Sequence, residues 1–261
     1  MEKKAIEIAI YAGGILRSYW GNLAKVRQKK YYWDLVTEAD LASEAYIIQS
    51  LKENFPGHAI LSEEAGLYHH EENPYQWCVD PLDGTTNFTH QYPMISVSIA
   101  LLEHQIPILG IIYNPISDEL FFASAGKGAT LNGRPLRVSK VDYLEQSLLG
   151  TGFAYDRKET KENNYREFCH VTNLSQGVRR GGSAALDLAF VAAGRLDGYW
   201  ERGLKPWDIA AGILLVQEAG GTCTSYEGGS IDLTSGRLLA TNGLIHKLLI
   251  KELKNSTITL Q

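Results

Sequence analysis

Residues 80–88 read Asp-Pro-Leu-Asp-Gly-Thr-Thr-Asn-Phe and follow the apolar run Trp77–Val79, which has the composition of a short strand. The proline fixes the backbone between Asp80 and Asp83, so that both carboxylates and the Leu82 carbonyl can face one point. The Gly-Thr-Thr segment that follows offers small residues and backbone N–H groups, which suit a phosphate. The stretch therefore predicts a turn that binds charged groups at the end of a strand.

Three further stretches place acidic residues next to turns. They are Asp34-Leu35-Val36-Thr37-Glu38-Ala39-Asp40, Ser62-Glu63-Glu64 and Trp207-Asp208-Ile209-Ala210-Ala211-Gly212. Each acid has an ordinary structural explanation: Asp40 completes a capping box, Glu63 lies in a solvated loop, and Asp208 starts a helix. Asp83-Gly84 alone is an ordinary turn. Only the joint presence of these stretches favours a shared site.

Carboxylates gathered in one place need a compensating cation, because like charges cannot all ionise together. Oxygen ligands without His or Cys nearby favour Mg²⁺ or Mn²⁺ over zinc. Divalent cations, a hydroxyl group and a phosphate-binding turn are the parts needed for metal-assisted hydrolysis of a phosphate ester. Because the chain carries a net charge of −5, an anionic substrate would depend on such local positive charge.

Together the four stretches, in this order and at this spacing, resemble the inositol monophosphatase family along nearly the whole chain. The resemblance implies an α/β (α+β) fold, a layered α-β-α-β-α sandwich of the inositol monophosphatase and fructose-1,6-bisphosphatase type. It implies an N-terminal lobe, residues 1–145, with most of the metal ligands. A C-terminal lobe, residues 146–261, would complete the site, and the two lobes would form one compact unit.

The resemblance also implies roles for the acidic residues. The ligands of Mg²⁺ would be the Leu82 carbonyl and the carboxylates of Glu63, Asp80, Asp83 and Asp208. Asp40 and Thr85 would activate the attacking water, because the Thr85 hydroxyl can accept a proton only if Asp40 holds its own. Gly84 and Thr85 would bind phosphate through their backbone.

Substrate contacts are implied for Gly182, Ser183, Ala184 and Glu201. Ser183 also suits a helix N-cap after a glycine turn, and Glu201 also suits a surface charge after a strand. For Arg179-Arg180 the sequence leaves two interpretations open: a contact with substrate or with another subunit, or a pair of solvated surface charges. Lys29 fits a basic residue near the active site. His69-His70 is interpreted as part of a polar loop rather than a metal site.

The activity implied is Mg²⁺-dependent, lithium-sensitive hydrolysis of a small phosphorylated polyol, foremost myo-inositol monophosphate, by a homodimer. Fructose-1,6-bisphosphatase, histidinol-phosphatase and nucleotide 3′-phosphatase activities remain alternatives with the same metal centre. An alternative of another class is a binding partner of the transcription machinery.

Composition narrows the other possibilities. The chain has no basic stripe, so direct nucleic-acid binding is not expected. No apolar stretch is long enough to span a bilayer, and the N-terminus does not resemble a signal peptide. Three widely separated cysteines are expected to be reduced. We therefore expect a cytoplasmic protein.

Hydrophobic periodicity predicts helices near the N-terminus, after Thr37, and at about 161–174, 184–193 and 207–219. It predicts strands at 59–61, 77–79, 95–102, 108–113, 120–123, 148–153, 198–200, 222–225 and 238–241. Asn132-Gly133 predicts a hairpin turn. Residues 21–33 and 67–75 are expected to be loops.

Overall fold

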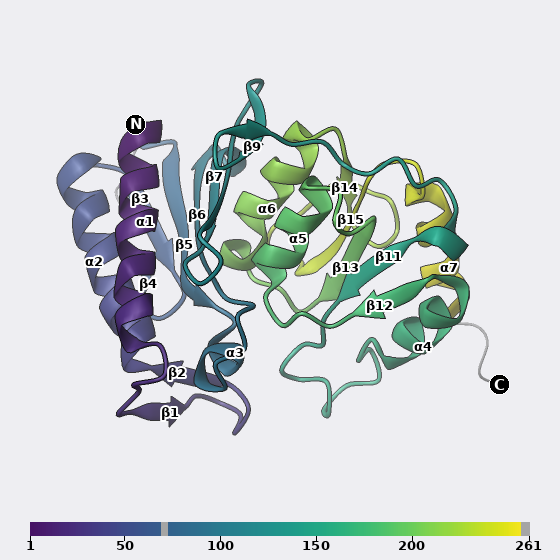
Figure 1. Cartoon of the computed structure of the whole chain (residues 1–261), viewed down its shortest axis with the longest axis horizontal. Coiled ribbons are helices and arrows are strands. Elements are labelled where there is room, and N and C mark those ends of the chain that lie inside the picture. Colours follow the sequence, from purple (N-terminus) through teal and green to yellow (C-terminus); the bar gives the residue numbers. More distant parts are fainter. Residues whose placement is uncertain (69–72, 257–261) are drawn as a thin grey trace.

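The computed structural model describes residues 1–68 and 73–256, which form alternating layers of helices and sheets (Figure 1). The helices are α1 (Glu2–Tyr19), α2 (Glu38–Asn54), α3 (Thr85–Thr89), α4 (Tyr165–Leu174), α5 (Ala184–Ala192), α6 (Pro206–Glu218) and α7 (His246–Ser256). A single 3-10 turn, Leu144–Gln146, precedes the second sheet among the described residues.

In the described part of the chain, the larger sheet has eight strands in the order β10-β9-β8-β7-β6-β5-β3-β4. Their bounds are β3 (Ala59–Ser62), β4 (Gly66–Tyr68), β5 (Tyr75–Asp83), β6 (Ser96–Glu103), β7 (Ile106–Asn114), β8 (Glu119–Ser124), β9 (Gly128–Leu131) and β10 (Arg134–Pro135). Among these described strands only β3 and β5 run parallel, and Ser62 pairs with Val79 in their register. The residues that follow, Glu63 and Asp80, therefore lie at the same end of neighbouring strands.

The smaller sheet has the order β12-β11-β13-β15-β14. Its strands are β11 (Leu148–Thr151), β12 (Gly177–Arg179), β13 (Gly198–Arg202), β14 (Thr222–Thr224) and β15 (Arg237–Thr241). β11 runs parallel to both of its neighbours, and the remaining pairs are antiparallel. A separate antiparallel hairpin joins β1 (Val26–Gln28) to β2 (Leu35–Thr37).

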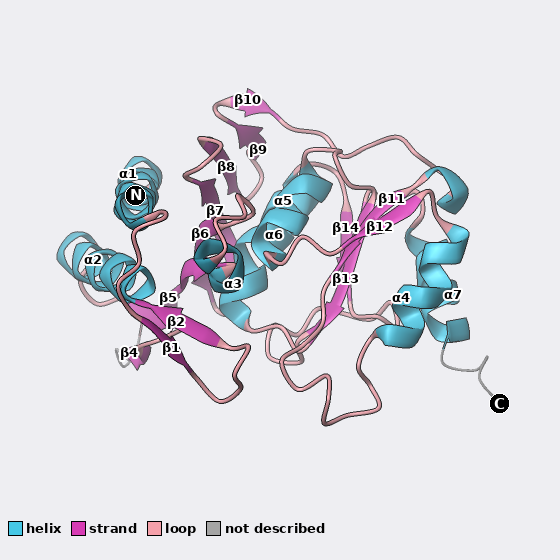
Figure 2. Cartoon of the chain, turned by 60° about the horizontal axis from the view of Figure 1, so that its bottom comes forward, coloured by secondary structure: helices cyan, strands magenta, loops and turns pink. Residues whose placement is uncertain are grey.

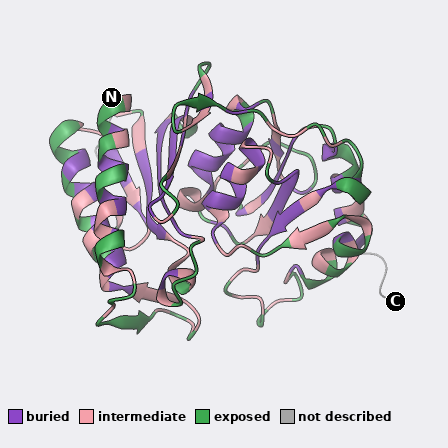
Figure 3. Cartoon of the chain, viewed as in Figure 1, coloured by how far each residue is buried: buried purple, intermediate pink, exposed green. Residues whose placement is uncertain are grey.

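Buried apolar clusters hold the layers together, and the described residues form three of them. One lies between α1 and α2 and the larger sheet, the second surrounds α5 and α6 between the two sheets, and the third lies between the smaller sheet and α4 and α7. Figure 3 shows burial concentrated on the sheets and on α5 and α6. Because sheets cover both sides of α5 and α6, these helices are apolar almost all round. The predicted α-β-α-β-α sandwich is confirmed.

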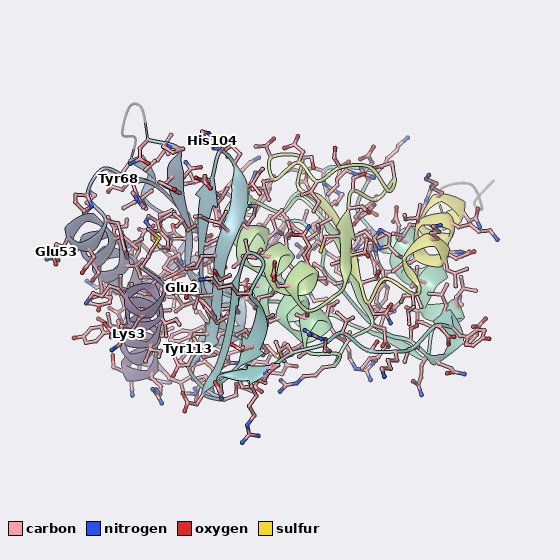
Figure 4. All side chains as sticks on the ribbon, turned by 90° about the horizontal axis from the view of Figure 1, so that it is seen from above. Glu2, Lys3, Glu53, Tyr68, His104 and Tyr113 are labelled. Atoms are coloured by element: carbon pink, nitrogen blue, oxygen red, sulfur yellow. The ribbon has the colours of Figure 1, made fainter. Side chains whose placement is uncertain are left out.

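Close contacts between layers depend on missing side chains. Gly13 of α1 faces Tyr113 of β7, which Figure 4 labels; a Cβ on Gly13 would lie 2.5 Å from the Tyr113 ring. On the other face of the same sheet, a Cβ on Gly110 would lie 2.7 Å from the Ala211 carbonyl oxygen of α6. Both glycines let a helix approach the sheet more closely than a substituted residue would allow.

Most element predictions are confirmed, and the errors are local. The segment 21–33, predicted as a loop, contains β1, whose three residues are all exposed and give no alternating pattern. The segment 67–75 contains part of β4 and the start of β5, while His69-His70 lies outside the described residues. The helix predicted from residue 161 begins only at Tyr165, after Asn164 with a φ of 67°.

The hairpin turn at Asn132-Gly133 is confirmed, with positive φ at both residues. The division into lobes at residue 145 stays a prediction. Along the described residues, no helix is long and apolar enough to cross a lipid bilayer.

Candidate active site

A pocket of about 290 Å³ opens where the two sheets approach each other. Its lining includes every residue for which a site role was predicted except Asp40, which lies buried behind Thr85. These lining residues are Glu63, Asp80, Leu82, Asp83, Gly84, Thr85, Gly182, Ser183, Ala184, Glu201 and Asp208. The structure thus brings together residues that are as far apart in sequence as 63 and 208.

The Asp80–Asp83 segment forms an irregularity at the end of β5. The register with β6 shifts between these two residues, and the Leu82 amide donates a 3.0 Å hydrogen bond to Asp80 Oδ1. Ser43 of α2 donates to the Pro81 carbonyl at 2.9 Å and fixes the segment from behind. Such a bulge redirects side chains out of the regular alternation, which lets both aspartates line one pocket.

Gly84 ends this strand and starts α3 in a left-handed conformation, with a φ of 92°. A Cβ at this position would lie 2.8 Å from the Met94 carbonyl oxygen, so a side chain is excluded by space as well as by φ. Asn87 of α3 donates to the Met94 carbonyl at 2.7 Å and to the Gly181 carbonyl at 2.9 Å. Through the bond of Asn87 to Gly181, this short helix connects the two halves of the chain. Figure 2 shows α3 beside the β1–β2 hairpin.

Asp83 makes a second connection between the halves. Its Oδ2 accepts hydrogen bonds from the Ser183 hydroxyl at 2.6 Å and from the Ala185 amide at 2.8 Å, both at the start of α5. The Ser183 hydroxyl also accepts from the Leu186 amide at 3.2 Å, which confirms Ser183 as the N-cap of α5. The start of α5 and the Asp80–Asp83 turn are thus held in one fixed arrangement.

Asp40 and Thr85 are hydrogen-bonded. The Thr85 hydroxyl lies 2.9 Å from Asp40 Oδ1 and 3.2 Å from the Leu82 carbonyl oxygen. Asp40 Oδ2 accepts from the Thr37 amide at 2.8 Å, and this completes the capping box predicted for α2. Burial raises the pKa of Asp40 to about 6, although its hydrogen bonds oppose the shift.

Glu63 follows β3 and forms a salt bridge with Lys29, whose Nζ lies 2.9 Å from Glu63 Oε1. Lys29 also forms a salt bridge with Glu64. The predicted basic residue near the acidic cluster is therefore confirmed as Lys29. The 62–65 segment is held from α2, because Glu44 accepts hydrogen bonds from the Ser62 hydroxyl and from the amides of Glu64 and Ala65, the last two at 3.0 Å. No sequence motif singled out Glu44.

Asp208 enters the pocket from the first turn of α6. Its Oδ2 accepts a 2.7 Å hydrogen bond from the Lys205 amide, and Pro206 occupies the first turn of the helix. Ser98 of β6 donates to the Trp207 carbonyl at 3.2 Å and fixes the start of α6 on the larger sheet. Asp208 therefore both starts a helix and lines the pocket.

The acidic side chains of the pocket raise one another's pKa values. Burial, followed by repulsion from neighbouring acids, raises the pKa of Asp80 and of Asp208 well above the ordinary value. Burial raises the pKa of Asp83 to about 6 against its hydrogen bonds. Within residues 1–68 and 73–256, no three acidic, His or Cys side chains already stand at metal-ligand spacing. The donors available are nevertheless buried, oxygen-only and mutually repelling, which fits a hard divalent cation.

Glu201 lies on β13 and lines the pocket, so its interpretation as a surface charge is wrong. Its carboxylate accepts a hydrogen bond from the Tyr199 hydroxyl, and burial raises its pKa to about 7. Arg180 also lines the pocket, and its charge opposes this rise in the pKa of Glu201. Of the pair 179–180, Arg180 is thus the residue that faces the site.

Two loops meet at the rim of the pocket. Trp33, from the β1–β2 connection, donates to the Tyr155 carbonyl at 3.1 Å, and Tyr31 donates to Glu159 at 2.8 Å. Lys158 lies 4.3 Å from the centroid of the Trp33 ring. The sequence gives no signal for this contact, because it joins two polar segments that carry no periodic pattern.

Comparisons with known proteins agree with this geometry. A model of the inositol monophosphatase family matches residues 1–257. An inositol-1-monophosphatase of Synechocystis sp. is 54% identical over 249 residues, which cover 95% of this chain and 87% of that protein. The Nus factor SuhB of Pseudomonas aeruginosa is 45% identical over 226 residues, which cover 83% and 82% of the two chains.

The solved structure of an inositol monophosphatase from Anabaena (Nostoc) sp. PCC 7120 superimposes with a TM-score of 0.90 at 52% sequence identity. The superposition covers 97% of this chain and 95% of that one. Fold, pocket and sequence agree over nearly the whole length: the chain belongs to the inositol monophosphatase family.

Proposed function

We propose that this protein hydrolyses a small phosphate monoester with Mg²⁺, foremost myo-inositol monophosphate. The observation that carries the proposal is the gathering of Glu63, Asp80, Asp83 and Asp208 around one pocket beside the hydrogen-bonded Thr85–Asp40 pair. Carboxylates alone would repel both each other and a phosphate. The same groups become productive once a divalent cation neutralises them.

The residues that would hold the cation are the four carboxylates and the Leu82 carbonyl. Hydrogen bonds to the amides of Leu82 and Lys205 orient Asp80 and Asp208, and Ser183 orients Asp83. When bound, Mg²⁺ would supply Lewis-acid activation of water and neutralise charge on the leaving oxygen. The positions of these ligands are set by a strand end, a bulge and two helix starts.

Thr85 and Asp40 are proposed to take the proton from the attacking water. The Thr85 hydroxyl points its proton at Asp40, so its oxygen is available to accept another proton. With a pKa near 6, Asp40 is mostly ionised at neutral pH and can hold this arrangement. The backbone amides of Gly84 and Thr85 are proposed to bind the phosphate.

The polyol part of the substrate is proposed to lie against the second half of the chain. Gly182, Ser183 and Ala184 at the start of α5 line this side of the pocket with Glu201. A carboxylate accepts hydrogen bonds from hydroxyl groups, which favours a polyol over an apolar alcohol. Fructose bisphosphate, histidinol phosphate and nucleotide 3′-phosphates remain candidate substrates for the same metal centre.

The test is a panel of phosphate monoesters, with and without Mg²⁺, assayed for release of inorganic phosphate. The proposal expects the largest kcat/KM for an inositol monophosphate, and inhibition when Li⁺ is added. Hydrolysis of none of the esters at any Mg²⁺ concentration would overturn it. A preference for another ester would change the proposed substrate, and the proposed metal-assisted hydrolysis would stand.

A second function is favoured by one finding, the similarity to proteins described as Nus factor SuhB. Contact with the transcription machinery through protein surfaces is therefore a candidate role beside catalysis, without direct nucleic-acid binding. Pull-down of purified transcription proteins by the wild type and by a catalytically inactive variant separates the two roles. We also propose a homodimer in the cytoplasm, which analytical ultracentrifugation and cell fractionation test.

A further inference from the structure

Asp187 is a second acidic side chain in the substrate half of the pocket. It is 3% exposed, lines the pocket, and lies on α5 three residues after Ala184, on the same face of that helix. In sequence it stands in the apolar run Ala184–Ala192, which is typical of a core helix. None of the roles described above uses it.

The Asp187 carboxyl group lacks the protein partners that its acidic neighbours have. Asp83 accepts from Ser183 and Ala185, and Glu201 accepts from Tyr199. No hydrogen bond or ion pair to the Asp187 carboxyl group is found within residues 1–68 and 73–256, and its surroundings act on it through burial and through the charges of Glu201, Asp83 and Arg180. Because the Asp187 carboxyl group lines the pocket without a protein partner, it is available to hydrogen-bond a ligand there.

Glycines leave room around both acidic groups. A Cβ on Gly181 would lie 2.7 Å from Asp187 Oδ1, and one on Gly150 would lie 3.6 Å from Asp187 Cγ. A Cβ on Gly152 would overlap the Glu201 carboxylate. The Asp187 and Glu201 carboxylates therefore occupy space that side chains at these positions would otherwise take.

Glu201 also acts on Asp187. After burial, the charge of Glu201 is the main cause that raises the pKa of Asp187, and Arg180 opposes it. Two carboxyl groups that line one pocket are unfavourable when both are charged, so burial favours the neutral form of at least one of them. A substrate hydroxyl can donate to a carboxylate or accept from a neutral carboxyl group, so two neighbouring hydroxyls suit this pair.

We propose that Asp187 is a specificity-determining residue that hydrogen-bonds a second hydroxyl of the substrate, adjacent to the hydroxyl bound by Glu201. This inference rests on the proposed phosphatase function and narrows its substrate to esters that carry two neighbouring free hydroxyls. An aryl phosphate, which has none, would not use Asp187.

The test compares Asp187→Leu, Asp187→Asn and the wild type on inositol 1-phosphate and on p-nitrophenyl phosphate, with thermal melting beside the kinetics. Leucine has a similar shape without polar atoms. Asp187→Leu should lower kcat/KM for inositol phosphate at least about tenfold, mainly through KM, and leave the aryl ester within about twofold. The melting temperature should rise, because an unpaired buried carboxyl group is removed. Asp187→Asn keeps a donor and an acceptor and should recover most of the loss.

Asp197 supplies the matched control. It is also a buried aspartate, but its carboxylate accepts from the Ser139 hydroxyl at 2.5 Å and the Leu148 amide at 2.6 Å, away from the pocket. Asp197→Leu should therefore lower the melting temperature and leave the ratio of the two kcat/KM values unchanged.

The outcomes separate the two proposals. If the wild type hydrolyses both esters and Asp187→Leu keeps their ratio, or destabilises the protein as Asp197→Leu does, the role of Asp187 is overturned and the phosphatase function stands. If the wild type hydrolyses neither ester with Mg²⁺, the proposed function fails and the role of Asp187 fails with it.

Discussion

The Thr85 hydroxyl lies 2.9 Å from Asp40 Oδ1, while the other oxygen of the same carboxylate caps α2 through the Thr37 amide. One buried carboxylate therefore begins a helix and holds the proton of the proposed catalytic hydroxyl. The capping box fixes the Asp40 side chain before any substrate binds, which is what a preorganised proton acceptor requires.

Asp40→Asn should lower kcat about 10²- to 10⁴-fold, because an amide is a much weaker acceptor for the Thr85 proton. The melting temperature should change little, since the side-chain oxygen of asparagine can still accept from the Thr37 amide. Glu38→Gln is the matched control: it removes another acid from the same first turn, whose carboxylate accepts from the Ala24 and Lys25 amides. Equal kcat values for the two variants would refute the assignment.

Asp80→Asn should raise the melting temperature of EDTA-treated protein and abolish turnover. The Asp80 carboxylate accepts from the Leu82 amide and is repelled by Glu63, Asp83 and Asp208. Asp83→Asn should not give this rise, because Asp83 has two donors to lose at the start of α5. Adding Mg²⁺ should stabilise the wild type more than either variant. A melting temperature independent of Mg²⁺ in all three would speak against a metal at these residues.

Glu201→Gln should lower kcat/KM for inositol phosphate. The corresponding loss of transition-state stabilisation should be roughly 1.5–3 kcal/mol, the range for a lost hydrogen bond to a charged group. Turnover of an aryl phosphate should change far less, because the metal ligands are untouched. Steady-state kinetics on both esters decide the matter. Equal losses would indicate a structural role through the contact with Tyr199.

The same variant tests a pH dependence of stability. Burial raises the pKa of Glu201 from 4.5 to about 7, so the folded protein binds this proton more tightly than the unfolded chain does. The resulting stabilisation is fully present below pH 4.5 and is lost as the pH rises through 7. Relative to Glu201→Gln, the EDTA-treated wild type should therefore lose stability between pH 5 and 8, by at most on the order of 3 kcal/mol. Parallel unfolding curves at all pH values would contradict the shift.

Glu44→Ala should weaken the response to Mg²⁺ without abolishing activity. The substitution leaves the Ser62 hydroxyl and the amides of Glu64 and Ala65 without their acceptor, so the segment that carries Glu63 loosens. A Mg²⁺ titration of activity should show a higher half-saturation value, with kcat largely recovered at high Mg²⁺. Glu53→Ala, on the exposed side of the same helix, should match the wild type.

The sequence predicted those site residues that belong to contiguous motifs. The bulge at Asp80–Asp83, the cap at Asp40 and the helix start at Asp208 are each set by neighbouring residues, so a local pattern reveals them. Glu44 and Asp187 were missed, because what they contact depends on how α2 and α5 pack against distant segments. In sequence, both are single acids within ordinary helices.

The same distinction explains the errors in the fold. Buried strands and helices with a clear apolar period were predicted within a few residues, whereas the exposed β1 was not. The existence of two separate sheets was expected only from the family resemblance, because strand order is decided by contacts between residues far apart in the chain.

The position of α6 between two sheets constrains how substrate enters and product leaves. Hinge opening of the halves would strip this helix from one sheet and expose an apolar surface that includes the Gly110–Ala211 contact. Such exposure would cost far more than thermal motion supplies. Substrate therefore enters and product leaves at the rim of the pocket. There the Trp33–Tyr155 hydrogen bond and the ring contacts of Lys158 can break without disturbing the buried apolar clusters.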